Sequence, residues 1–348
     1  MKRIVRHRLF WPVVALISLI VINTIARPQF IGVTVRDGEL YGALIDILRN
    51  SAPLMLVALG MTIVIATRGI DLSVGAVMAV SGAVALTIID GSPDPEGVGT
   101  VTIAVVTALA VALVLGSWNG FLVAIGGIQP IIATLVLMLA GRGVALLITE
   151  GFITTVNSAP YSFISSGYIV GLPVAFLIAA VAITTLALLE RRTALGVLTE
   201  AVGINPAASR LAGVRARGIV FSAYVATGLL AGVAGILYSA NIRAADANAT
   251  GQFIELYAIL AVVLGGTSLA GGKFTIAGTV IGVLIIQTLE STILFLGVPA
   301  AQSPVFFAIV VIVVVVVQSP QLHAWVRKLA RSRQSANTDA PQKVKVAS

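Results

Sequence analysis

Long apolar runs separated by short polar or charged breaks dominate this chain. Most of the runs approach the length of about 20 residues that a helix needs to cross the hydrocarbon core of a membrane. Runs such as 311–317 do not alternate apolar and polar positions, as the strands of a membrane β-barrel would. The pattern predicts an all-α integral membrane protein with about ten transmembrane helices. These helices are expected at residues 9–26, 51–67, 72–90, 101–124, 129–149, 171–189, 218–239, 255–271, 275–296 and 303–318.

Composition supports a membrane protein and excludes several kinds of chemistry. Hydrophobic residues make up 58% of the chain and charged residues 10%, whereas soluble domains carry about a quarter charged residues. There is no cysteine, which excludes disulfides and thiolate chemistry, and both histidines, His7 and His323, lie in polar tails. A Ser-His-Asp constellation is therefore out of reach. We expect no enzyme activity and no metal or cofactor bound by this chain.

The distribution of lysine and arginine predicts the orientation of the chain. With ten crossings, 17 of the 22 basic residues fall on one side, so the positive-inside rule places both termini in the cytoplasm. The net charge of +8 then reflects topology and gives no reason to expect nucleic acid. We expect a cytoplasmic tail at 1–8, a polytopic domain at 9–331 and a disordered cytoplasmic tail at 332–348.

The connection at 190–217 is the only long one predicted on the inner side. Asn205 followed by Pro206 favours the start of a helix, and Gly213 is a typical stop. The sequence therefore predicts a two-turn helix between two membrane helices, a suitable contact for a cytoplasmic partner. The alternative is a solvated basic loop that only obeys the positive-inside rule.

Two glycine-punctuated breaks interrupt the apolar pattern, at 68–75 and at 264–274. Paired interruptions are typical of an internally repeated, inverted transporter with broken helices, and the alternative is two tight inner turns. The sequence leaves open whether the first break lies at the membrane midplane or at the cytoplasmic face. The second break is not a phosphate loop, because Thr267 stands at the first glycine position and Phe274 replaces the magnesium-binding hydroxyl residue.

Polar side chains near the apolar runs are candidates for a translocation path. An uncharged, hydroxyl-rich sugar would need amides, hydroxyls and occasional carboxylates, and no series of membrane-centre carboxylates suggests ion coupling. Arg142 could contact substrate or form a structural bond between helices, while Glu255 and Glu290 could be functional or simply reach the interface. The path candidates are Asp71, Ser73, Asn119, Gln129, Thr134, Arg142, Asn241, Asp246 and Asn248.

Three motifs in order resemble the ribose/galactoside-type permeases of bacterial ABC sugar importers. They are GIDLSVGAVMA at 69–79, EAVGIN to AGV at 200–214, and AVVLGGTSLAGGKF at 261–274. The resemblance covers nearly the whole chain. Within that family, WNGFLVA at 118–124, IQPIIATL at 128–135, AGRGVA at 140–145 and the stretch 243–248 look most like galactofuranose permeases.

This resemblance implies a multi-pass permease of the bacterial inner membrane that imports galactofuranose or a related galactose- or ribose-type sugar. It implies a periplasmic sugar-binding protein, a second permease subunit, identical or paralogous, and a cytoplasmic ABC ATPase that carries ATP and magnesium. The loop at 190–217 would be the ATPase-coupling loop, through Glu200, Gly203, Asn205, Arg210 and Gly213, although Val202 departs from the wider motif. The alternative is a self-sufficient secondary carrier or facilitator for small polar solutes.

Overall fold

The computed structural model describes residues 9–297 together with Val305, Ala308, Ile309 and Ile312. The predicted tails at 1–8 and 332–348 and most of the predicted span at 303–318 lie outside the described residues. Contacts group the chain into two units, Met1–Thr292 and Ile293–Ser348. The helices α1 to α11 and most of α12 belong to the first unit.

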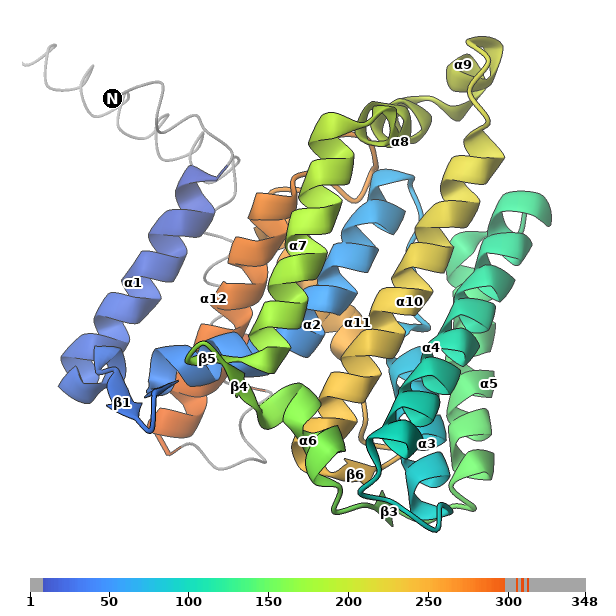
Figure 1. Cartoon of the computed structure of the whole chain (residues 1–348). Helices are drawn as coiled ribbons and strands as arrows, with labels where there is room; N and C mark the ends of the chain where they lie inside the picture. The colour runs from blue at the N-terminus through green and yellow to red at the C-terminus, as the bar shows by residue number, and fades with distance from the viewer. Residues whose placement is uncertain (1–8, 298–304, 306–307, 310–311, 313–348) are drawn as a thin grey trace, which may run out of the picture. The chain divides into compact units, whose positions relative to one another are not determined.

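The described part of the chain is mostly helical (Figure 1). Its helices are α1 (Phe10–Ala26), η1 (Pro28–Ile31), α2 (Ala43–Ala66), α3 (Val74–Asp90), α4 (Val98–Gly120), η2 (Phe121–Ile125), α5 (Pro130–Ile148), α6 (Ala159–Ser166), α7 (Val174–Arg192), α8 (Ala194–Ile204), α9 (Pro206–Leu211), α10 (Ala216–Ile242), α11 (Ile254–Leu264) and α12 (Ile276–Phe295). Three two-stranded antiparallel pairs join β1 (Thr34–Arg36) to β2 (Glu39–Tyr41), β3 (Thr154–Thr155) to β6 (Ala244–Ala245), and β4 (Tyr168–Ile169) to β5 (Leu172–Pro173).

Nine of the ten predicted spans correspond to described helices. Six helical segments, α2, α4 with η2, α5, α7, α10 and α12, are long and apolar enough to cross a membrane. The helices α1, α3 and α11 are apolar but shorter. The predicted span at 255–271 is too long, because α11 ends at Leu264 and a glycine-rich turn follows.

Helix α10 is the central element of the first unit and packs along α2, α3 and α4. Its contact with α4 is made through glycine: a Cβ placed on Gly228 would lie 2.6 Å from the Cα of Gly116. Small residues of this kind allow two membrane helices to approach until their backbones touch. Helices α2 and α12 are joined by a buried hydrogen bond of 2.7 Å between the hydroxyls of Thr62 and Thr279.

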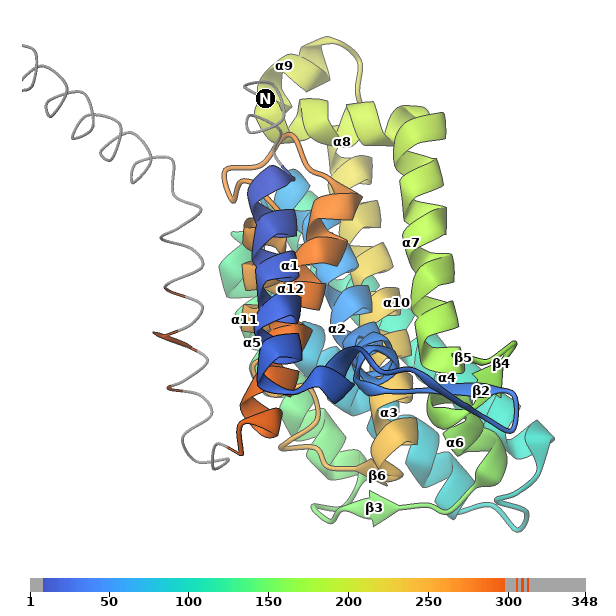
Figure 2. The ribbon, with the colours of Figure 1, turned by 90° about the vertical axis from the view of Figure 1, so that its left-hand side faces the viewer.

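The span predicted at 51–67 begins earlier than hydropathy indicated, because α2 already starts at Ala43. Residues from Ala43 onward form the first turns of α2, which bends before it continues through the bundle (Figures 1 and 2). Pro53 lies inside α2 and lacks the N–H that would bond one turn back, which accounts for the bend. Ile45 and Ile47, in the turns of α2 before the bend, are buried.

The connection between the spans predicted at 129–149 and 171–189 contains a helix that hydropathy did not reveal, α6. Tyr161 on this helix is 1% exposed, and its hydroxyl is 2.7 Å from that of Ser239 on α10. Phe152, by contrast, is 76% exposed. The hydrogen-bond partner on α10 explains why Tyr161 packs inward, since a buried tyrosine hydroxyl needs one.

Candidate functional site

The first glycine-punctuated break is an extended segment that runs into the bundle. Helix α2 ends at Ala66, and α3 begins only at Val74, farther along the bundle axis (Figure 1). Within this segment, Leu72 donates its N–H to the hydroxyl of Thr134, in the second turn of the neighbouring helix α5. Farther along α5, a Cβ on Gly141 would lie 3.0 Å from the Cβ of Ala76 in α3. The break is therefore more than a tight turn at the end of two helices.

Asp71, at the centre of this break, gathers a buried polar cluster. Its Oδ1 accepts hydrogen bonds from the N–H of Ser73 at 2.9 Å and from the Ser73 hydroxyl at 2.6 Å. The amide of Asn119 on α4 donates to the same oxygen at 3.5 Å and to the Ser73 hydroxyl at 2.8 Å. All three side chains are at most 1% exposed. Three residues proposed from the sequence for a translocation path thus lie in one hydrogen-bonded group.

One hydrogen-bond acceptor of this polar cluster has no donor among the described residues. Within the described part of the chain, the Oδ1 atom of Asn119 is buried and has no hydrogen-bond partner. A buried amide oxygen without a donor is costly, so such groups call for an explanation. A hydroxyl-bearing solute is one kind of molecule that could supply the missing donor.

Arg142, in the second half of α5, binds backbone carbonyls of the segment that leads into α11. Its guanidinium donates to the carbonyl of Ala247 at 2.8 Å and also to that of Thr250. The sequence left two roles open for Arg142, contact with substrate and a structural bond. These two hydrogen bonds are structural. The Asp246 carboxylate accepts the N–H groups of Asn248 and Ala249 and so shapes the turn that presents those carbonyls.

The first turns of α3 and α11 meet inside the bundle. A Cβ on Gly75 would lie 2.3 Å from the carbonyl oxygen of Gly251, 2.9 Å from a Glu255 carboxylate oxygen and 3.4 Å from an Arg142 nitrogen. Glycine is required at residue 75 because backbone from the second half of the chain occupies the space of a side chain. Glu255 is buried at this meeting point, so the interfacial position considered from the sequence is wrong for it.

The predicted helix in the long loop is present, and a second helix precedes it. The side chain of Asn205 caps α9 by accepting the N–H groups of Ala207 and Ala208, as the sequence suggested. Gly213 follows with a φ of +84°, which few other residues adopt. Helices α8 and α9 lie at one end of the bundle, and α6 lies at the other (Figures 1 and 2). Arg210 is exposed on α9, and Glu200 is half-buried on α8.

Gly203 of α8 lies where the two glycine-punctuated breaks meet. The N–H of Gly272 donates to the carbonyl of Ala66, the last residue of α2, at 2.9 Å. A Cβ on Gly203 would lie 1.9 Å from that carbonyl oxygen and 2.6 Å from the Gly272 nitrogen. The guanidinium of Arg68 donates to the carbonyl of Ile204. We call the contacts among 66–68, 203–204 and 271–272 the three-segment junction.

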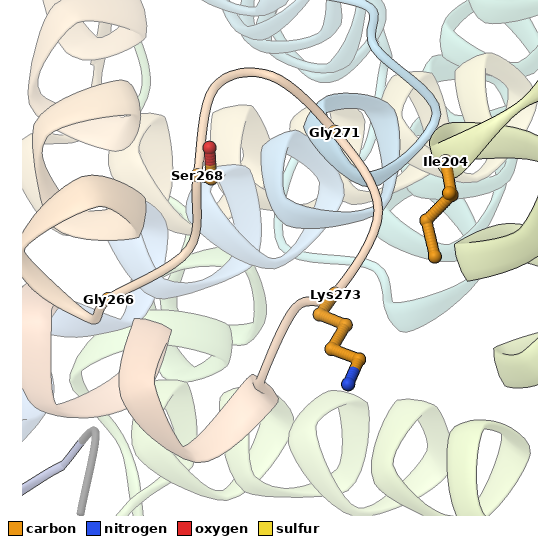
Figure 3. A pocket seen from close by; sticks show the side chains of 5 residues that line it. All are labelled: Ile204, Gly266, Ser268, Gly271 and Lys273. Atoms are coloured by element: carbon orange, nitrogen blue, oxygen red, sulfur yellow. The ribbon is translucent and has the colours of Figure 1, made fainter. Parts of the chain in front are cut away.

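A pocket of about 490 Å³ opens beside the three-segment junction, and Figure 3 shows its lining. The turn after α11 arches from Gly266 past Ser268 and Gly271 to Lys273, and Ile204 faces it from α8. Among the described residues, no group of three or more histidine, aspartate or glutamate side chains could hold a metal ion.

The remaining path candidates are not part of these clusters. Gln129 precedes α5 and is exposed. Asn241, in the last turn of α10, and Asn248, which follows that helix, are also exposed. Sequence reasoning also missed the backbone groups that matter most, the carbonyls of Ala66 and Ile204 and the N–H of Gly272. The only signal for them was glycine itself, at Gly203 and Gly272, since glycine marks places where backbones approach closely.

Comparison of the amino-acid sequence with known proteins places the chain in a family. Residues 43–315 match the family model described as branched-chain amino acid transport system / permease component. The chain is 47% identical to the galactofuranose transporter permease protein YtfT of Escherichia coli, over 94% of this chain and 96% of that protein. It is 44% identical to the fructose import permease protein FruF of Bifidobacterium longum, over 95% of this chain and 93% of that protein.

A third relative, the ribose import permease protein RbsC of Escherichia coli, is 37% identical over 88% of this chain and 92% of its own length. No solved structure matches the chain. The family's description names amino acids, whereas these three relatives are named for sugars. The chain belongs to the branched-chain amino acid transport system / permease component family, as a multi-pass permease of the inner membrane.

Proposed function

We propose that this chain is the membrane-spanning permease subunit of an ATP-driven ABC importer for a monosaccharide, with galactofuranose as the leading substrate. The observation that carries the proposal is similarity along nearly the full length to three sugar import permeases, at 37% to 47% identity. Galactofuranose is the sugar named for the relative at 47%, and fructose and ribose are the competing substrates.

In this proposal the chain crosses the membrane ten times, with both termini in the cytoplasm. Six span-length helices and the shorter α1, α3 and α11 support nine of the crossings. The opposed helices α3 and α11 support an inverted internal repeat. Gly75 in the first turn of α3 meets Gly251 in the turn that leads into α11, and α11 runs toward the three-segment junction while α3 runs away from it.

The partners are an ABC ATPase, a second permease subunit and a periplasmic sugar-binding protein. ATP and magnesium bind the ATPase, and this chain binds no cofactor of its own. The α8–α9 loop is the surface that the ATPase engages, through Glu200, Asn205, Arg210 and the glycines 203 and 213. Two features support this role: α9 is well capped, and its apolar Leu211 is 91% exposed.

The buried group of Asp71, Ser73 and Asn119 is proposed to line the translocation path. Its hydroxyl, amide and carboxylate groups suit a sugar, and the unpartnered Oδ1 of Asn119 could accept a sugar hydroxyl. Arg142 and Asp246 are proposed to hold the segment before α11 in place beside this path.

The test is transport by the reconstituted complex. The chain is co-expressed with its ATPase and binding protein, purified, and placed in proteoliposomes that contain ATP. Galactofuranose, fructose and ribose are then offered separately. Uptake that requires both ATP and the binding protein supports the proposal, and the sugar taken up fastest identifies the substrate. Uptake by the chain alone without ATP would instead identify a secondary carrier.

A further inference from the structure

Arg68 occupies a backbone position that normally belongs to glycine. Helix α2 ends in a Schellman motif, in which Gly69 donates its N–H to the carbonyl of Val64 and Arg68 donates to that of Ile65, both at 2.9 Å. Arg68 itself has a φ of +67°, in the left-handed region that residues with a Cβ rarely adopt. Glycine would form this turn at lower energy, so the Arg68 side chain serves something other than the turn.

The contacts of this side chain span three segments. Its guanidinium donates to the carbonyl of Ile204, at the C-terminal end of α8, where the helix dipole favours a positive charge. Its Cγ lies so close to Gly271 that a Cβ on that glycine would be 2.4 Å away. Arg68 thus joins the end of α2 both to the α8–α9 loop and to the turn after α11.

Arg68 is also close along the chain to the buried polar cluster. Gly69 follows it, and a Cβ there would lie 2.4 Å from the hydroxyl oxygen of Tyr224 on α10. Asp71 comes two residues later and is tied to Asn119 on α4. A displacement of Ile204 therefore reaches Asp71 through one side chain and three residues of closely packed backbone.

We infer that Arg68 is a positioning residue that transmits movement of the α8–α9 loop to the segment 69–73. This inference rests on the proposed function, because it assumes that a partner ATPase moves the loop. The Arg68 side chain is exposed, and within the described part of the chain it makes one hydrogen bond, to the Ile204 carbonyl, so its removal should disturb coupling far more than folding.

The informative substitution is Arg68→Gly, which keeps the left-handed turn and removes the side chain. In proteoliposomes with the ATPase and binding protein, we expect Arg68→Gly to raise the ATP hydrolysed per sugar transported about tenfold, within the usual range of coupling between sites. Its thermal unfolding temperature should equal or exceed that of the wild type. Arg68→Lys keeps the charge without the planar fork and should lie between the two.

Arg36→Ala is the matched control, since Arg36 is an exposed arginine in β1, outside the α8–α9 loop and the three-segment junction. It should keep the wild-type ratio of ATP to sugar. An unchanged ratio in Arg68→Gly would overturn the inference. Equal losses of uptake and ATP hydrolysis together with a lower unfolding temperature would also overturn it, because they indicate a merely structural role. If the wild-type complex itself shows no ATP-driven uptake of galactofuranose, fructose or ribose, the proposed function fails first.

Discussion

Replacing Gly203 with alanine is the most direct test of the packing at the three-segment junction. The new Cβ would lie 1.9 Å from the carbonyl oxygen of Ala66 and 2.6 Å from the nitrogen of Gly272. Both atoms belong to backbone, and their mutual hydrogen bond of 2.9 Å lies directly against the intruding methyl group. A carbon atom needs more than 3 Å from either one, so the segments must separate by about 1 Å or more.

The energetic cost can be estimated from this displacement. Overpacking of a closely packed site costs about 1–3 kcal/mol, and occasionally more. Alanine recovers up to about 1 kcal/mol relative to glycine through its helix propensity, and less near a helix end such as that of α8. The net loss of about 1–2 kcal/mol is small against the stability of the whole bundle, but it falls on the contact between the loop and both breaks.

We therefore expect Gly203→Ala to assemble in the membrane and to lose most ATP-driven uptake. The measurement compares uptake per assembled complex, with assembly followed by size-exclusion chromatography of the detergent-solubilised protein. Gly218→Ala is the matched control, because a Cβ there meets only the Cβ of Arg215, at 4.0 Å. It should transport normally and unfold at the same or a higher temperature. Wild-type uptake and unfolding temperature in Gly203→Ala would refute the close packing inferred for the junction.

Three further substitutions test the clusters described above. Asp71→Ala leaves donors of Ser73 and Asn119 unpaired and should destabilise the protein by about 1–3 kcal/mol, whereas Asp71→Asn should keep the fold, which thermal unfolding in detergent would show. Arg142→Leu removes two charge-assisted bonds and should cost about 3 kcal/mol, measured as accelerated proteolysis of the turn before α11, with Arg142→Lys intermediate. Asn205→Ala should weaken α9 by about 1 kcal/mol and reduce uptake, and Asn205→Asp should restore it, because aspartate caps equally well.

Hydropathy alone predicted most of the fold, because burial in lipid or in protein needs the same apolar side chains. It could not distinguish a helix that spans the bundle from one that begins inside it. The predicted starts of α3 and α11 lie within two residues of the observed ones, but their position inside the bundle was not predicted. Nor could it predict that Tyr161 turns inward, since that depends on Ser239 in a distant helix. Local signals did better: the cap formed by Asn205 involves only neighbouring residues, and it lies where the sequence placed it.

The candidate site was predicted in part for a related reason. Asp71 and Ser73 are close in sequence, and polar residues within apolar runs attract notice. Their bonds to Asn119 join positions 46 and 48 residues apart, and the bond from Arg68 to Ile204 joins positions 136 apart. Only the folded chain reveals such pairs. The hydrogen-bonding groups of the junction are largely backbone atoms, which every residue carries, so residue type gives no indication of them.

The placement of these contacts limits how the loop could act on the path. The segment 69–73 is tied at one end through Arg68 to Ile204 and at the other through Asp71 to Asn119. Its helical hydrogen bonds are confined to its two ends, from the N–H of Gly69 to Val64 and from the N–H of Val77 to the carbonyl of Ser73. Residues 70 and 71 lie outside any helix, so the middle of the segment can shift while the flanking helices stay intact. The Gly272 to Ala66 bond carries the same displacement to the turn between α11 and α12. A movement of α8 would therefore reach both halves of the chain together, as expected if their opposed helices, α3 and α11, open and close around one path.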